Sequence, residues 1–597
     1  MDRQRIETRE FDNWRKGQVF ADVTRMPRND DSYCSMNMQV YDSGALGPRP
    51  RLREFTNTGF TPANDLVLGD NSCVQYKESD AAAGDAYGHL YLYSVSVGGA
   101  AAQAYYYEFD TSATLGWKSA AGIGALTLPN ATEWSRKRAG WTAAVSDKVG
   151  NSQSDSLGPE DFVFLGQKKW DGSSATAIDW GNGTVINTIT NAVFYRGRLW
   201  GWSQDNLGKN RLYYTDIDDY TDSDSALQYI DISNASGKVF IKGCWPVRDS
   251  LLIALSDDSW YSFTGTPATG TLRFIGKYVT PSHGAAAAVL GNAVYFMAPD
   301  GQGVCAATPS GVDTITYKDK IPWVHEGNWN IFTEYRALSS PDRSALHLMT
   351  VDGSTGYMGV AIEKVNDQWY LTSYGNGYDY FGSNIGTNGY GILRDCATIN
   401  FGNAYAFLTY GSYFDNSSGT TFYDISLLTR DIILNRPSRD DDVFSSKTDP
   451  SKSIGGVSLT VSDIGSSALR LSPFSADYGE EARVSRIIID FSYWRNSDGD
   501  YPTPTLKLRI KDATNTTAII HSDSSSFDTW AASTSNLPNA AANADYRGMQ
   551  ARYVYDLPMG TFHPDMYIEL HNIEAIAINK ITVDYEIRPD NFTTRNY

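Results

Sequence analysis

The sequence lacks any run of about 18 apolar residues, the length that a membrane-spanning helix needs. Its amino-terminal stretch, MDRQRIETREFDNWRKG, is charged where a secretory signal requires an apolar segment. We therefore expect neither a transmembrane helix nor a signal peptide. Long stretches with helical periodicity are also missing. The 52 glycines, 38 tyrosines and aromatic content of 13% favour short strands and tight turns.

Cysteine is sparse and irregularly placed. Five cysteines occur, an odd number, far apart and without the paired spacing of a metal site. Disulfide frameworks are typical of short secreted chains. We predict a reducing compartment and buried free thiols at Cys34, Cys73, Cys244, Cys305 and Cys396.

Positive charge is in deficit. Lys and Arg number 50 against 69 Asp and Glu, so the formal net charge is −19 and the pI is near 4.8. Proteins that bind nucleic acid neutralise its phosphates with clustered Lys and Arg. The deficit of Lys and Arg argues against a nucleic-acid-binding protein of this kind. An acidic wall would instead repel DNA and let it slide past without sticking.

Motifs of catalysis and metal binding are missing too. No Walker loop occurs, the GIG at 122–124 lacks the strand–helix context of a dinucleotide site, and VHEGN around His325 has no second His four residues on. Two acidic clusters, DIDDYTDSD from Asp216 and NSDGD from Asn496, do not fit the twelve-residue calcium loop, so we interpret them as solvated turns. We expect no cofactor, no metal and no enzymatic activity.

A glycosidase or sialidase propeller is the alternative to that expectation, and such an enzyme would carry paired carboxylates over the central channel. The sialidase turn Ser-x-Asp-x-Gly-x-Thr-Trp is approached by SDDSW at Ser256 and SFDTW at Ser526, but both lack its Gly. Exposed aromatic residues could stack on sugars. Alternating strands favour packing within or between blades for Trp200, Trp202, Trp260 and Trp369.

Strand patterns dominate what is present. In NAVFYRGRLWGWSQDNLGKNRLYYTDIDDYTD, from Asn191 to Asp222, the runs 193–203 and 211–217 alternate as strands do, and the gap between them has Asp, Asn and Gly for a reversal. We predict an antiparallel hairpin. Comparable runs recur about 35 to 75 residues apart, and a blade of four short strands takes about 40 to 50 residues. These runs are DSWYSFTG from Asp258, NAVYFMAPDG from Asn292, DQWYLTSY from Asp367 and NAYAFLTYGS from Asn403.

The predicted fold class is all-β, with a propeller of about six or seven blades over residues 55–430. Residues 1–54 read as an extended arm, in which the GPRPR segment cannot be a central strand. The Pro- and Asp-containing stretch 431–455 is a predicted linker. Beyond it, 456–597 alternates cleanly, as in KITVDYEI from Lys580, and predicts a carboxy-terminal β-sandwich.

Three segments in order resemble the β-propeller tail hub or nozzle proteins of short-tailed bacteriophages. They are SMNMQVYDSGALGPRPR, YRGRLWGWSQDNLGKNRLYYTDIDDYTD and WPVRDSLLIALSDDSWYSFTG, and ITVDYEIRPD looks like the closing strand of such proteins. The resemblance is clearest over 191–296. No single motif is specific to the family, but their order is characteristic of it.

The resemblance implies a structural virion protein, made in the host cytoplasm and built into the tail. It implies a homo-oligomeric ring, typically a hexamer, attached below the portal and adaptor, with fibres, spikes or tip proteins nearby and genomic DNA leaving through the lumen. An arm that reaches the next subunit would add contact between identical chains. The candidate arm residues are Asn37, Met38, Tyr41, Pro48, Arg49 and Pro50, and the candidate acidic residues of the lumen are Asp216, Asp218, Asp219, Asp440, Asp441 and Asp442.

Two alternatives stay open at this point. No insertion that would form a narrow nozzle is evident, so the chain could be a receptor- or glycan-binding distal tail protein whose sandwich recognises a cell-surface glycan. A glycan hydrolase is the third interpretation. Ring assembly, glycan binding and polysaccharide turnover distinguish the three.

Overall fold

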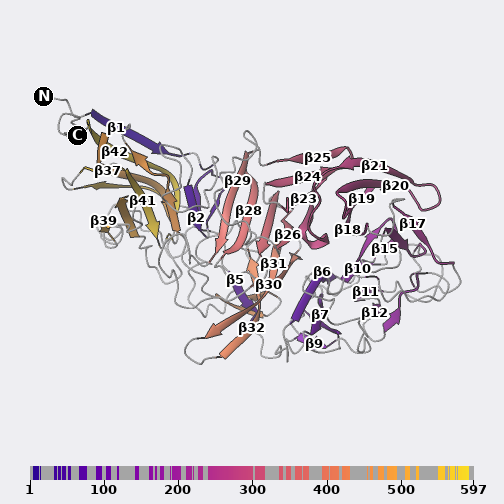
Figure 1. Ribbon diagram of the computed structural model, residues 1–597. Coiled ribbons are helices and arrows are strands. Elements are labelled where there is room, and N and C mark those ends of the chain that lie inside the picture. Colours follow the sequence, from indigo (N-terminus) through magenta and orange to yellow (C-terminus); the bar gives the residue numbers. More distant parts are fainter. Residues whose placement is uncertain are drawn as a thin grey trace.

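The computed structural model is built of β-strands, with one short 3-10 turn among its described elements (Figure 1). The structure describes residues 5–12, 14, 33–36, 38–41, 43–48, 52–55, 66–76, 89–96, 102–108, 117–119, 142–146, 161–165, 168–170, 175–180, 189, 191–202, 210–217, 220, 226–232, 239–299, 303–315, 335–340, 344–350, 357–365, 368–375, 393–401, 404–415, 420–429, 453–454, 457–461, 468–475, 480–493, 505–510, 519–523, 549–557, 562–563, 565–571, 573 and 576–589.

Seven antiparallel sheets, built from the described residues of 52–461, form a propeller. Blades one to six have four strands each. Their strands are β6 (Leu66–Tyr76), β7 (His89–Ser96), β8 (Ala102–Glu108), β9 (Trp117–Ser119); β10 (Thr142–Ser146), β11 (Asp161–Leu165), β12 (Lys168–Trp170), β13 (Ala175–Ala177); β14 (Asn191–Tyr195), β15 (Arg198–Trp202), β16 (Arg211–Tyr214), β17 (Tyr229–Asp231); β18 (Ile241–Val247), β19 (Ser250–Leu255), β20 (Ser259–Thr264), β21 (Thr271–Lys277); β22 (Ala287–Leu290), β23 (Ala293–Met297), β24 (Val304–Thr308), β25 (Gly311–Thr314); and β26 (Tyr335–Ser340), β27 (Ala345–Thr350), β28 (Tyr357–Val365), β29 (Gln368–Gly375).

Blade seven closes the propeller by combining strands from both of its ends. β30 (Leu393–Phe401), β31 (Ala404–Asp415) and β32 (Thr420–Thr429) pair in order, and β5 (Leu52–Phe55), which precedes blade one, pairs with β32. β34 (Val457–Val461) then pairs with β5, and β33 (Ser453–Ile454) with β34. The first strands of successive blades contact one another from β6 through β10, β14, β18, β22 and β26 to β30, and β30 contacts β6.

Tight turns within the blades explain one departure from the predicted strands. The run 193–203, expected to be one strand, reverses at Arg196 and Gly197, whose φ angles are 52° and 71°. Positive φ at both central residues is typical of a type I′ hairpin turn, and Arg gives little sequence signal for it. The expected pairing across the polar gap does form, because β15 pairs with β16 in the register Trp200 to Tyr214.

Two six-stranded sheets form the second domain. One has the path β3-β4-β42-β37-β40 with β1 also on β42, and the other has the path β2-β35-β41-β38-β39 with β36 also on β41. Their bounds are β1 (Arg5–Phe11), β2 (Tyr33–Met36), β3 (Met38–Val40), β4 (Leu46–Pro48), β35 (Ala468–Leu471), β36 (Phe474–Ser475), β37 (Glu480–Tyr493), β38 (Thr505–Ile510), β39 (Ile519–Asp523), β40 (Met549–Asp556), β41 (Asp565–His571) and β42 (Ile576–Pro589).

One apolar core lies between these two sheets, as expected of a β-sandwich. The alternation in KITVDYEI is confirmed, since all four residues of its predicted inner face are buried there: Ile581, Val583, Tyr585 and Ile587. The sandwich rests on the propeller through blade six, where β29 contacts β2 and β3 and Tyr370 packs against the core. The all-β fold class with a propeller is thereby confirmed.

The amino-terminal segment differs from the expected extended arm of residues 1–54. Its described strands are members of the two domains: β1 pairs with β42 from Arg5–Ile587 to Phe11–Ile581, β2 pairs with β35, and β5 completes blade seven. Phe11 and Trp14 are buried in the sandwich core, and that burial holds the segment on its own chain. The sandwich also begins later than residue 456, because β34 belongs to the sheet of blade seven.

Candidate functional site

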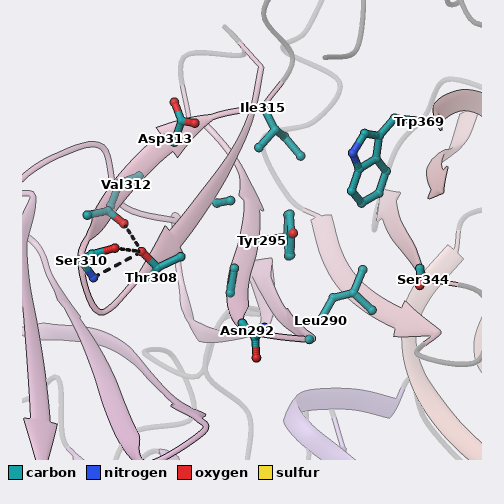
Figure 2. A pocket seen from close by; sticks show the side chains of 14 residues that line it. Leu290, Asn292, Tyr295, Thr308, Ser310, Val312, Asp313, Ile315, Ser344 and Trp369 are labelled. Atoms are coloured by element: carbon teal, nitrogen blue, oxygen red, sulfur yellow. Dashed lines mark hydrogen bonds between the residues drawn. The ribbon is translucent and has the colours of Figure 1, made fainter. Parts of the chain in front are cut away.

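A pocket of about 690 Å³ lies between blades five and six (Figure 2). Leu290 at the end of β22, Tyr295 on β23 and Trp369 on β29 are among its large apolar side chains, together with Ile315. The Tyr295 and Trp369 rings are tilted by 52° with centroids 6.4 Å apart. The volume falls within the range of small-molecule sites, about 300–1,000 Å³.

Polar side chains form the rim of this pocket, and they come from turns and from an outermost strand. Asn292 lies in the β22–β23 turn, Ser310 in the β24–β25 turn, Ser344 immediately before β27 and Asp313 on β25. Among the described residues that line the pocket there is no Lys, Arg or His, and Asp313 is the one carboxylate.

Hydrogen bonds brace the rim. The Thr308 hydroxyl is 2.8 Å from the Ser310 hydroxyl, donates to the Gly311 carbonyl at 3.1 Å and accepts from the Ser310 amide at 3.3 Å. In the β22–β23 turn, at the same end of the blade, Arg248 Nε donates to Asn292 Oδ1. These bonds fix the turn geometry before any ligand arrives, which lowers the entropy cost of binding.

The propeller's own channel is occupied at one level by the 3-10 turn η3 (Gly284–Ala286). This turn precedes β22 and contacts the first strands of blades one, four and six, namely β6, β18 and β26. Trp245 Nε1 donates to the Gly284 carbonyl at 3.3 Å, and a Cβ on Gly243 would stand 3.0 Å from the Gly284 Cα. Gly243 therefore permits the close approach of η3 to blade four.

Three polar residues near that turn form hydrogen bonds and an ion pair with one another. Lys242 Nζ donates to Thr280 Oγ1 at 2.8 Å and lies 3.9 Å from Asp258 Oδ1, and Thr280 Oγ1 donates to Asp258 Oδ1 at 2.8 Å. Burial lowers the pKa of Lys242, while the Asp258 charge acts in the opposite direction. We interpret the cluster as a structural element that stabilises blade four, because its polar atoms form hydrogen bonds and an ion pair with one another.

The sandwich contains a buried ionic group on neighbouring strands β35 and β41. Arg470 binds Glu569 Oε1 through Nη2 at 2.7 Å and Nε at 2.8 Å, and His571 Nε2 is 2.9 Å from Glu569 Oε2. The Glu569 side chain is 0% exposed. Its position inside a sheet favours a structural role, since a substrate would have to displace the core to reach it.

Cys34 faces this group from β2, in register with Arg470. Burial raises the pKa of the Cys34 thiol to about 11; the Arg470 charge lowers it and the Glu569 charge raises it. Cys244 is also buried, and burial raises its pKa too. Among the described cysteines, Cys34, Cys244 and Cys305 are free thiols, as predicted, whereas the side chains of Cys73 and Cys396 lie outside the described residues.

These thiols should resist alkylation in the native protein. We expect iodoacetamide at pH 8 to leave Cys34, Cys244 and Cys305 unmodified, because all three are buried out of contact with the reagent and burial raises the pKa of Cys34 and Cys244. All three should react in urea. Mass spectrometry of proteolytic peptides checks this, and rapid native labelling of Cys34 would be inconsistent with its position in the sandwich core.

Of the predicted acidic residues of a lumen, the structure describes Asp216. Asp216 follows β16, where it lies 3.6 Å from Arg198 Nη1 and accepts a hydrogen bond from Gln228 Nε2 at 2.7 Å. It is thus tied to its own blade. Asp218, Asp219 and the triplet 440–442 lie outside the described residues.

The described residues of the predicted arm lie in the sandwich. Met38 is fully buried in the sandwich core, so its side chain is not available to a neighbouring subunit. Tyr41 is half-buried in the β3–β4 turn, where its amide donates to the Ala45 carbonyl at 2.8 Å, and Pro48 ends β4. Asn37, Arg49 and Pro50 lie outside the described residues.

Packing is the observed role of three of the four singled-out tryptophans. Trp200, Trp202 and Trp260 are buried in blade cores, and Trp260 Nε1 donates to the Val279 carbonyl at 3.0 Å. Trp369 is half-buried and faces the pocket instead. Its strand pattern gave no sign of this, because the pocket forms only where blade five meets blade six.

In the part of the chain that the structure describes, no three His, Cys, Asp or Glu side chains gather as metal ligands. Within the same residues, no helix has the length and hydropathy needed to cross a membrane.

The comparisons with known proteins assign the chain to no family. No family model matches the chain, and no curated protein matches it. Among solved structures, BBS1N in complex with ARL6DN is 12% identical, with a TM-score of 0.33 over 64% of this chain and 99% of that one. A putative 6-phosphogluconolactonase from Bacteroides fragilis is 11% identical, with a TM-score of 0.34 over 58% and 95%. The Cps50 (Swd1) β-propeller domain of Myceliophteria thermophila is 12% identical, with a TM-score of 0.24 over 50% and 97%.

Proposed function

We propose that this chain is a structural subunit of a bacteriophage tail. Identical subunits assemble into a ring, most simply a hexamer, that serves as the hub or nozzle below the portal and adaptor and anchors fibres, spikes or tip proteins. Genomic DNA passes through the lumen without specific binding, and the chain has no catalytic role. The proposal joins the resemblance over 191–296 to one feature of the propeller surface.

That feature is a group of exposed apolar side chains at the outer edges of two adjacent blades, here named the blade 3–4 edge. Leu227 and Tyr229 of blade three are each 37% exposed, and Phe274 of blade four is 51% exposed. Ile230 of β17 and Leu272 of β21 pack on the core cluster that blades three and four share, whereas the Tyr229 ring packs on Tyr213 on the other face of blade three. Exposed aromatic residues are typical of surfaces that contact another protein.

The cations of the blade 3–4 edge have carboxylate partners within their own blades. Arg211 lies over the Tyr229 ring at 4.1 Å from its centroid and 3.0 Å from Asp231, and Lys277 at the end of β21 lies 3.6 Å from Asp257. The exposed apolar side chains therefore carry the proposed contact. One edge of a subunit against a different face of the next subunit is a heterologous contact, which repeats around a closed ring.

The propeller interior adds a constraint on the DNA path. Since η3 contacts first strands of three blades across the channel, the channel of a single chain is not the conduit in this proposal. The lumen lies between subunits, and acidic walls there would keep DNA mobile.

The test is a matched pair of charge substitutions. We expect Tyr229→Asp with Phe274→Asp to raise the dissociation constant of the ring at least about a hundredfold, because central aromatic residues of an interface commonly contribute ~2 kcal/mol or more each. Analytical ultracentrifugation measures the shift to monomer.

Val554→Asp is the control, because Val554 is 45% exposed but lies on β40 of the sandwich. Assembly of the double variant at wild-type concentrations would remove the blade 3–4 edge from the interface. Loss of assembly in the Val554 variant alone would move the interface to the sandwich.

A further inference from the structure

We propose that the pocket between blades five and six receives Phe274 of the neighbouring subunit. This inference rests on the proposed ring and names the surface that the blade 3–4 edge contacts in it. A closed ring needs two different surfaces on every subunit, because the contact between successive subunits is heterologous. The blade 3–4 edge is one of these surfaces, and the pocket is the other.

Phe274 stands out from the edge of blade four. It is 51% exposed on β21, the outermost strand of its blade. Its ring meets that of Tyr261 in an edge-on contact with centroids 5.3 Å apart, which restricts the orientation of the exposed side chain. Burying an exposed phenylalanine is favourable, so a pocket on another subunit that takes up this ring would stabilise the assembly.

The pocket has the walls that an aromatic ring requires. Leu290, Tyr295 and Ile315 of blade five and Trp369 of blade six line its volume of about 690 Å³ (Figure 2). Because Trp369 lies on β29, the outermost strand of blade six, the pocket reaches the outer edge of the propeller. Interfaces commonly gain most of their binding energy where an aromatic side chain enters a pocket of this kind.

The charges on the two surfaces are compatible with burial. At the blade 3–4 edge, Arg211 and Lys277 have carboxylate partners of their own. The described lining of the pocket contains no Lys, Arg or His, and its carboxylate, Asp313, also has an interaction partner. The contact therefore buries none of these charges without a partner, which would be strongly unfavourable.

The positions of the two surfaces suit a closed ring. They lie two blades apart, and two blades of seven span two-sevenths of a full turn, about 100°. In a ring of five or six subunits, the directions from one subunit to its two neighbours differ by about 108° to 120°. With the propeller axis along the ring axis, one subunit presents Phe274 to one neighbour and its pocket to the other.

The test is a complementation between two variants of the full chain. Phe274→Asp removes the projecting ring, and Ala306→Trp fills the pocket from its wall, where Ala306 is 8% exposed. We expect each variant alone to need at least about tenfold more protein to assemble than the wild type. An equimolar mixture should form dimers and nothing larger, because Phe274 of one variant still fits the open pocket of the other. Analytical ultracentrifugation measures all three samples.

Val554→Trp is the control for an added tryptophan, because Val554 is 45% exposed on β40 of the sandwich. It should assemble as the wild type does. Rings formed by Ala306→Trp at wild-type concentrations, or a mixture that stays monomeric as it is concentrated, would overturn the pocket as the partner surface and leave the ring itself standing. A wild type that never assembles would overturn the ring and this inference together.

Photocrosslinking keeps the inference testable if Ala306→Trp does not fold. Replacing Phe274 with p-benzoyl-phenylalanine keeps an aromatic side chain at the edge of blade four. On irradiation of the assembled protein, we expect crosslinks between subunits to peptides that contain Leu290, Tyr295 or Trp369, identified by mass spectrometry. Crosslinks between subunits that reach only sandwich peptides would contradict the inference.

Discussion

Replacing Glu569 with glutamine is expected to lower the free energy of unfolding of the sandwich by about 3–5 kcal/mol. The substitution keeps the shape of the side chain but leaves the buried Arg470 guanidinium without its carboxylate. His571 loses the same partner. Urea titration followed by hydrogen–deuterium exchange of peptides from β35 and β41 measures the loss where it arises.

Two controls separate the buried charge from the loss of any ion pair. Asp556→Asn removes a carboxylate from the exposed ion pair with Arg486. It should leave the urea midpoint unchanged, because water screens that pair. Replacing Arg470 and Glu569 together with methionine should be less harmful than Glu569→Gln, since no uncompensated charge remains. If Glu569→Gln and Asp556→Asn lowered the free energy of unfolding equally, the buried ionic group would contribute no more to stability than an exposed ion pair.

Truncating Phe11 and Trp14 to alanine should cost about 3–5 kcal/mol of sandwich stability for each residue. Both side chains are 2% exposed and fill the core beside Tyr33, whose ring centroid is 5.4 Å from that of Trp14 in an edge-on contact. A free amino-terminal arm would show almost no effect. Thermal unfolding and hydrogen exchange of β42 peptides report the change.

Ile6→Ala is the matched control on the same strand. Ile6 is 70% exposed, so its truncation should change stability by no more than about 0.5 kcal/mol. Equal tolerance of Phe11→Ala and Ile6→Ala would mean that β1 does not belong to the sandwich.

The sequence predicted those parts of the fold that depend on local alternation. The burial pattern of KITVDYEI lies within a few residues and is confirmed, and each repeated aromatic run forms a strand. The long-range pairings were not predictable in this way. Nothing in LREF at 52–55 indicates that it completes a blade whose other strands begin some 340 residues later, because partner choice depends on the closed propeller and not on local pattern.

The site was less predictable than the fold. Trp369 has the same alternating surroundings as Trp260, yet Trp260 is buried between Trp245 and Phe296 while Trp369 lines a pocket. The difference arises from how blade six meets its neighbours. Phe274 was within reach of sequence analysis, since TLRFIGK has no clean alternation and the strand proves largely exposed.

The most direct test of the proposed ring is the mass of the purified wild-type protein in solution, measured together with negative-stain images of the same sample. The account predicts a mass several times the 65.9 kDa of one chain, and rings with open centres. A single species of 65.9 kDa that persists as the protein is concentrated, with no rings in the images, would contradict it.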